Sequence, residues 1–179
     1  MTYKLLLAVF AASFVFLPVT SQAASTVPVN VKIQTVDGKD AGTITLTDKK
    51  GGVAFKLDLM NLPPGEHAIH VHQFPKCDPP DYRSSGFHFN PAGKKHGIKN
   101  PEGFHDGDIP LNLKVGANGT EKSSFVVKTI SLDPSAPNSI LANGGTSIVI
   151  HADVDDMETD PGGNSGARIA CGLVLPPGM

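Results

Sequence analysis

Several residue types are scarce in this chain of 179 residues. It has no tryptophan, two tyrosines and only two cysteines, and its formal net charge at pH 7 is −2. Without a basic excess or a basic stripe interleaved with aromatic residues, the composition argues against nucleic-acid binding. No stretch has the periodicity of a long amphipathic helix. The length suits one domain, with no internal repeat and no second domain.

The N-terminal segment is expected to be a leader that is removed. Lys4 is followed by an apolar run through Phe16, about as long as the hydrophobic region of a signal peptide. Small residues suited to a signal peptidase follow at 21–23. We therefore expect residues 1–23 to be a signal peptide and residues 24–179 to be the mature domain.

A membrane anchor is the alternative for this segment. Pro18 and the polar residues 20–22 keep the apolar run below the ~20 residues that a spanning helix needs. We therefore expect no membrane attachment after cleavage, and a periplasmic or secreted protein. Cleavage would remove Lys4 and change the formal net charge from −2 to −3.

The two cysteines are Cys77 and Cys171. An exported chain with two cysteines is expected to pair them, although two free thiols or two metal ligands remain alternatives. A disulfide between them would close a loop that the chain-entropy model values at roughly 4–5 kcal/mol, as an upper figure.

Short runs of alternating apolar and polar residues dominate the rest of the chain. They are rich in β-formers and separated by turn residues such as Asp37-Gly38 and Lys50-Gly51-Gly52. The runs expected to be strands lie near residues 29–34, 43–47, 53–60, 65–74, 111–115, 122–128, 130–132, 147–152 and 167–175. About eight strands with short hairpins predict an all-β protein, a β-sandwich or flattened barrel.

Two long stretches have no such alternation. One runs from about Pro75 to Pro110 and the other from Asp153 to Gly166. Structureless segments of this length in a compact domain are usually functional loops. The first holds four of the residues that could bind metal, so we expect it to be functional.

Seven histidines are distributed over these strands and loops. His70 and His72 alternate with apolar residues, so on a strand their imidazoles leave the same face about 7 Å apart. His151 ends the apolar strand around residues 148–150. His88, His96 and His105 lie in the first long loop and are followed by Asp108.

These residue types separate into two kinds of metal site. Three histidines, His70, His72 and His151, with one more imidazole, give an all-nitrogen site that suits copper. Three histidines and one carboxylate give a four-coordinate site that suits zinc; these are His88, His96, His105 and Asp108. His88 is the natural candidate to serve both, because two adjacent dications can remove both protons of an imidazole.

The motifs that carry these residues closely resemble the copper/zinc superoxide dismutases. The resemblance covers about Val27 to Leu175, and its spacings are specific. The matching segments are His70-Val71-His72, Gly86-Phe87-His88-Phe89-Asn90-Pro91, His96-Gly97, His105-Asp106-Gly107-Asp108, Val149-Ile150-His151 and Gly166-Ala167-Arg168-Ile169-Ala170-Cys171-Gly172. The leader makes the chain similar to an exported bacterial member, and the fold implied is an eight-stranded Greek-key β-sandwich.

The resemblance implies a role for each residue. One copper per chain would be bound by His70, His72, His88 and His151, and one zinc per chain by His88, His96, His105 and Asp108. Cys77 and Cys171 would form the intramolecular disulfide. Asp155, in preference to Asp156, would connect ligands of the two metals, in line with the rule that ligating imidazoles donate their other N–H to an outer acceptor. His67 would be structural.

The reaction implied is the disproportionation of superoxide to dioxygen and hydrogen peroxide, with copper cycling between its +2 and +1 states. Arg168 and His88 would be the catalytic residues. Arg168 would attract the superoxide anion with a charge that persists at any working pH. His88 would carry a proton when it leaves copper, while zinc, which has no redox chemistry, tunes this bridging imidazole.

The second loop departs from the eukaryotic pattern. It is shorter and carries acidic residues but no lysine, so the charge pattern that guides superoxide in those enzymes is not transferred. Lys94, Lys95 and Lys99 of the first loop could contribute, although simple solvation of these lysines is the favoured interpretation. Subunit contacts differ within the family, so both a monomer and a homodimer stay open.

Two rival functions fit the sequence less well than the enzyme does. A secreted metal carrier would keep the ligands but has no use for Arg168 beside copper. A zinc hydrolase would need a general base and a helical HExxH motif, which His70 and His72 do not form.

Overall fold

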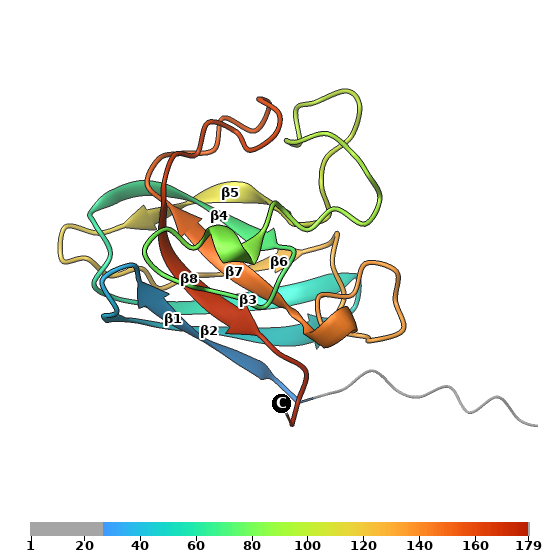
Figure 1. The fold of residues 1–179 in the computed structure, drawn as a ribbon, viewed down its shortest axis with the longest axis horizontal. Coiled ribbons are helices and arrows are strands. Elements are labelled where there is room, and N and C mark those ends of the chain that lie inside the picture. The colour runs from blue at the N-terminus through green and yellow to red at the C-terminus, as the bar shows by residue number, and fades with distance from the viewer. Residues whose placement is uncertain (1–26, 179) are drawn as a thin grey trace, which may run out of the picture.

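The computed structural model describes residues 27–178, and the regular structure within them is almost entirely β-strand (Figure 1). Eight strands are joined by hairpins and loops: β1 (Val29–Thr35), β2 (Asp40–Lys49), β3 (Gly52–Leu59), β4 (Gly65–His72), β5 (Asp108–Val115), β6 (Ser124–Val127), β7 (Thr146–His151) and β8 (Arg168–Val174). Two short 3-10 helices, η1 (Arg83–Ser85) and η2 (Ala142–Gly144), lie in the connections.

The strands form one antiparallel sheet that curls into a nearly closed barrel. Its order is β5-β4-β7-β8-β1-β2-β3-β6, so that β1 pairs with β8, β4 with β7 and β3 with β6. These neighbours are distant in sequence, which is the mark of Greek-key connections. The predicted eight-stranded Greek-key β-sandwich or flattened barrel is confirmed.

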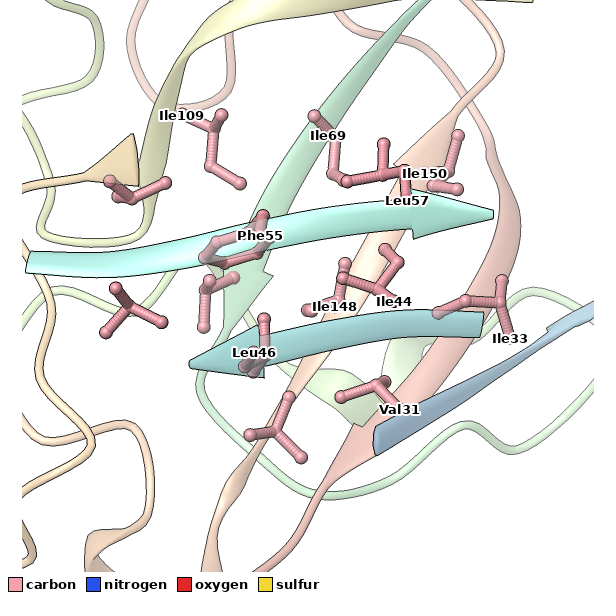
Figure 2. Close-up of a cluster of buried hydrophobic side chains, with 14 of the residues drawn as sticks. Val31, Ile33, Ile44, Leu46, Phe55, Leu57, Ile69, Ile109, Ile148 and Ile150 are labelled. Atoms are coloured by element: carbon pink, nitrogen blue, oxygen red, sulfur yellow. The ribbon is translucent and has the colours of Figure 1, made fainter. Parts of the chain in front are cut away.

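The core follows directly from the alternation in the sequence. In β1 every second residue is buried, and β3 repeats the pattern. Isoleucine, leucine and phenylalanine side chains from β1, β2 and β3 meet those from β4, β5 and β7 in one cluster (Figure 2). Each such fully buried side chain contributes roughly 1.5–3 kcal/mol, so the cluster fixes the register of the strands that carry the histidines.

Two strand predictions differ from the structure. Residues 130–132 are not a strand: Ile130 and Leu132 are buried in the core, but Ser131 makes only an isolated bridge with Ser139. Alternation reports which side chains are buried, and here no ladder accompanies the burial. β5 begins at Asp108 rather than Leu111, because Pro110 is tolerated in a strand at the end of the sheet order.

Both long stretches without alternation are loops, and they lie on the same side of the barrel (Figure 1). The loop between β4 and β5 covers residues 73–107, and the loop between β7 and β8 covers residues 152–167. We name them the first and the second metal loop.

The two cysteines form the predicted disulfide. It joins Cys77 of the first metal loop to Cys171 of β8, with the Cα atoms 5.8 Å apart. Among residues 27–178, no helix is long and apolar enough to cross a membrane. The predicted signal peptide, residues 1–23, lies outside the described residues.

Candidate metal centre

Three of the predicted copper ligands are carried by two neighbouring strands. His70 and His72 lie on β4, opposite Val149 and Ser147 of β7, and His151 ends β7. The ring centroids of His70 and His72 are 6.4 Å apart, close to the separation expected for residues i and i+2 of a strand. The Nε2 atoms of His72 and His151 approach to 3.4 Å.

His88 completes this group from the first metal loop. An isolated antiparallel bridge to His72 brings the loop alongside β4. The ring centroids of His70 and His88 are then 3.9 Å apart. One nitrogen from each of the four buried imidazoles lies within 4.8 Å of the others, a spacing that suits one metal ion.

The four predicted zinc ligands form a second buried group that shares His88. The Nδ1 atoms of His88, His96 and His105 lie 2.8, 3.1 and 3.1 Å from Oδ1 of Asp108. The other carboxylate oxygen, Oδ2, accepts hydrogen bonds from the backbone N–H of Gly97 and of His105. One carboxylate at the start of β5 therefore organises all three imidazoles.

Asp155 of the second metal loop connects the two groups. Its Oδ2 lies 2.8 Å from Nε2 of His70, and its Oδ1 lies 3.0 Å from Nε2 of His96. Asp156, the less favoured choice, is half-buried and accepts hydrogen bonds from Thr159 and Asn164 of its own loop. Asp155 thus lies in the position expected of the connecting carboxylate.

The electrostatics differ between the two groups. Burial lowers the pKa of His88 to about 3 and holds the pKa of His72 and His151 well below the ordinary value. For His96, burial opposes the charge, but hydrogen bonds to Asp108 and Asp155 outweigh it and raise the pKa to about 9. The imidazoles of the first group are therefore neutral at neutral pH, which is the form that binds metal.

A pocket of about 300 Å³ opens onto the first group, and its lining includes His72, His88, His151 and Arg168. The Arg168 guanidinium is held by backbone carbonyls at 2.7 Å, Nη1 by Tyr82 and Nη2 by Gly86. A third hydrogen bond runs from Nη1 to Oγ of Ser85 at 3.0 Å. The cation is therefore fixed beside the imidazoles by the first metal loop.

The remaining predicted residues lie away from the pocket. His67 bonds only to backbone, its Nδ1 2.9 Å from the carbonyl oxygen of His151 and its Nε2 2.9 Å from that of Pro63. Nζ of Lys99 donates to the backbone oxygen of Asp156, and Lys95 pairs with Asp160 at 3.6 Å. These two lysines fasten the metal loops to each other.

No sequence pattern singles out Tyr82, Ser85 or Ser165. Tyr82 donates its hydroxyl to the carbonyl of Thr35 at 2.6 Å and so ties the first metal loop to β1. Ser85 and Ser165 contact metal-group imidazoles. The only shared signal is that a glycine follows each serine, which is too common to be informative.

The donor set fits the two metals that the resemblance implies. Nδ1 of His70 is buried and has no hydrogen-bond partner in the described part of the chain, although a buried polar atom normally has one. Its Nε2 is taken by Asp155, so Nδ1 is the nitrogen left for a metal. Four imidazoles suit copper, and three imidazoles with one carboxylate suit zinc.

Comparison with known proteins identifies the class. The copper/zinc superoxide dismutase family model matches residues 40–174. A copper-zinc superoxide dismutase of Aquifex aeolicus is 45% identical over 138 residues, which cover 76% of this chain and 81% of the relative. One of Caulobacter vibrioides is 41% identical over 140 residues, covering 77% and 80%.

Solved structures of similar proteins support the same class. A SOD-like protein from Bacillus subtilis superposes with a TM-score of 0.78 at 37% identity, covering 82% of this chain and 97% of that one. The Cu/Zn superoxide dismutase from Brucella abortus gives a TM-score of 0.67 at 30% identity, covering 82% and 99%.

A Greek-key barrel with two fused histidine groups defines a binuclear metalloprotein. The chain belongs to the copper/zinc superoxide dismutase family. It is an oxidoreductase that converts superoxide to dioxygen and hydrogen peroxide, with copper and zinc as its cofactors.

Proposed function

We propose that each residue serves this reaction in the role that its position supports. Copper is held by His70, His72, His88 and His151, and zinc by His88, His96, His105 and Asp108. The observation that carries the assignment is that both groups are buried, each within 4.8 Å, and share His88. When bound, copper supplies the one-electron chemistry, while zinc, which has no redox chemistry, organises its ligands.

Arg168 is proposed to bind and orient the superoxide anion. Its guanidinium lines the same pocket as His72, His88 and His151, and three hydrogen bonds fix it there. Burial lowers its pKa from the ordinary value, but an arginine remains charged at any working pH. A fixed cation at a narrow opening acts mainly on the encounter rate of a small anion and is screened by salt.

His88 is proposed to carry a proton during turnover. Its Nδ1 is held 2.8 Å from Asp108, which leaves Nε2 to face the pocket side of the imidazole. With copper held there, Nε2 would be a ligand; without it, Nε2 would hold a proton for the product. The contact between Nδ1 and Asp108 would keep the ring in place for that transfer.

Asp155 is proposed to hold the two groups in register. It accepts from Nε2 of His70 and of His96, so a displacement of one group is felt by the other. Outer carboxylates of this kind set the tautomer and orientation of ligating imidazoles.

The test combines metal analysis with an activity assay on protein purified from an oxidising compartment. We expect one copper and one zinc per chain and rapid removal of superoxide. Copper bound without turnover would instead favour a metal carrier.

We further propose that residues 1–23 direct export and that residues 24–179 act in the periplasm or outside the cell. The disulfide supports an oxidising compartment. N-terminal sequencing of the purified protein tests the cleavage site after Ala23. The mass of the same purified protein in solution tests whether it is a monomer or a homodimer.

A further inference from the structure

Two copies of one local arrangement flank the proposed copper ligands, one in each metal loop. We name them the Ser-Gly steps: Ser85-Gly86 in the first metal loop and Ser165-Gly166 in the second. Both serines are buried, with 0% and 5% of their surface exposed. Both glycines have positive φ, 78° and 74°, where a side chain would be strained.

The hydrogen bonding of the two serines is the same. Oγ of Ser85 donates to the carbonyl of Tyr82 three residues earlier at 2.8 Å, and the backbone N–H of Ser85 donates to the same oxygen. Oγ of Ser165 donates to the carbonyl of Gly162, also three residues earlier and also at 2.8 Å, and its N–H does likewise. Each hydroxyl proton is thereby committed, so each oxygen is left as an acceptor.

The Nδ1 atom of one imidazole faces each Ser-Gly step. Nδ1 of His72 lies 3.0 Å from the carbonyl oxygen of Gly86 and 3.4 Å from Oγ of Ser85. Nδ1 of His151 lies 3.2 Å from Oγ of Ser165 and 3.4 Å from the carbonyl oxygen of Gly166. With acceptors on that side, each imidazole carries its proton on Nδ1 and presents an Nε2 lone pair.

The two steps differ in what else they hold. Oγ of Ser85 and the carbonyl of Gly86 also accept from the Arg168 guanidinium, at 3.0 and 2.7 Å. The first step therefore ties Arg168 to His72. Among the side chains of residues 27–178, the second step holds His151 alone, and there the hydroxyl is nearer than the carbonyl.

We propose that Ser165 is a positioning residue that fixes the tautomer and orientation of His151, and that Ser85, its counterpart, fixes Arg168 beside His72. The inference rests on the proposed ligand set. It goes beyond that set because neither serine is a ligand, and the two serines separate the copper geometry from the attraction of the anion.

The first test replaces Ser165 by alanine in the copper- and zinc-loaded protein. The only remaining acceptor for Nδ1 of His151 would be 3.4 Å away. We expect copper affinity, measured by chelator competition, to fall about tenfold, as is typical when an outer partner of a ligand is lost. The electron paramagnetic resonance spectrum of Cu(II) should change. The affinity for azide, used here as a small anionic probe of the Arg168 pocket, should stay within twofold of that of the unaltered protein.

The second test replaces Ser85 by alanine. His72 keeps the nearer carbonyl of Gly86, so the Cu(II) spectrum should be retained. Arg168 loses one of its three hydrogen bonds, so we expect azide affinity to fall roughly two- to tenfold, the effect of one hydrogen bond.

Ser147→Ala is the matched control. Ser147 is a buried serine on β7, opposite His72, and its hydroxyl has no hydrogen-bond partner. Both the spectrum and the azide affinity should be unchanged in this variant.

A third measurement uses the unaltered chain, loaded with zinc but not copper, and so does not depend on a variant that folds. Imidazole ¹H–¹⁵N spectra should show His151 protonated on Nδ1. Protonation on Nε2 would overturn the proposal, as would an unchanged Cu(II) spectrum in Ser165→Ala or an unchanged azide affinity in Ser85→Ala. If the unaltered protein itself lacks a four-nitrogen copper spectrum, the proposed ligand set fails instead.

Discussion

The copper half and the zinc half of the centre are built on different kinds of backbone. Three copper ligands lie on β4 and β7, adjacent strands whose register is fixed by the core. The zinc half takes three imidazoles from the first metal loop and gathers them on one carboxylate, Asp108. The strand-borne half inherits its geometry from the fold, whereas the loop-borne half depends on its own polar contacts.

This difference suggests that the two halves fail separately. Loss of zinc should loosen the first metal loop and leave the strand imidazoles in place. The links between the halves are few among the described residues: His88 belongs to both, and Asp155 bonds to both.

Asp108→Ala should have the largest effect, and that effect should fall on the zinc half. It removes the acceptor shared by three imidazoles, and removing one partner from a buried charged network typically costs about 3–5 kcal/mol. We expect zinc to be lost while most copper is retained, with faster amide exchange in residues 73–107. Metal analysis and hydrogen exchange measure both effects, and equal loss of the two metals would contradict the separation.

Acid should unfold the metal-free protein through its neutral imidazoles. The pKa of His88 is about 3 in the folded chain, against 6.5 ordinarily, so the unfolded state binds more protons between these values. Stability is therefore lost as the pH falls below 6.5, by about 2 kcal/mol between pH 7 and pH 5 for His88 alone. His72 and His151 shift in the same direction.

His96 acts in the opposite sense, because its pKa is raised to about 9. Its contribution is present below pH 6.5 and is lost as the pH rises through 9. Urea unfolding of chelator-treated protein at pH 7 and pH 5 measures the balance. Greater stability at pH 5 than at pH 7 would show that His96 contributes more to the pH dependence than His88, His72 and His151 together.

Arg168→Ala should affect the copper half of the centre alone. We expect kcat/KM for superoxide to fall by about tenfold or more at low salt, because the anion loses its electrostatic attraction. Its dependence on ionic strength should also weaken, while the copper content is unchanged. Arg168→Lys keeps the positive charge but loses the hydrogen-bonded guanidinium. We therefore expect a kcat/KM between those of the unaltered protein and the alanine variant. Loss of copper in the alanine variant would refute the steering role.

Gly163→Ala should give the smallest effect. It places a methyl group against Asp155, which connects the two halves. Its φ is 64°, and a Cβ there would overlap Oδ1 of Asp155 and lie 2.7 Å from Nε2 of His96, so these side chains must shift. Gly93 has a φ of 63° with nothing within 4 Å, so Gly93→Ala carries only the backbone strain, about 1 kcal/mol. Zinc affinity should fall several-fold further in Gly163→Ala than in this control. Equal zinc affinities in the two variants would mean that Asp155 can shift without weakening zinc binding.

Much of the fold could be predicted because burial alternates along the strands, as β1 and β3 show residue by residue. The failure at residues 130–132 has the same origin, since their alternation records burial without pairing. The early start of β5 was missed because Pro110 resembles a strand breaker. An edge position removes that objection, and position in a sheet cannot be read from local sequence.

The candidate site divides in a similar way. Residue type and spacing singled out the histidines and Asp108, and the resemblance added Arg168 and Asp155. Ser85 and Ser165 could not be found, because a serine acquires meaning only from the imidazole that a distant strand brings to it. Tyr82 was missed for the same reason, since it acts through a backbone carbonyl of β1.

The pairing of β1 with β8 also has a consequence for the order in which the molecule can be completed. The first strand to be synthesised finds its partner on the last, 139 positions along from Val29 to the start of β8 at Arg168. The same final strand brings Cys171 and Arg168. A nascent chain that stops before Arg168 therefore lacks both the pairing of β1 with β8 and the anion-attracting pocket. The barrel can assemble only after β8 has been synthesised, and a product truncated before it would expose the unpaired edges of β1 and β7.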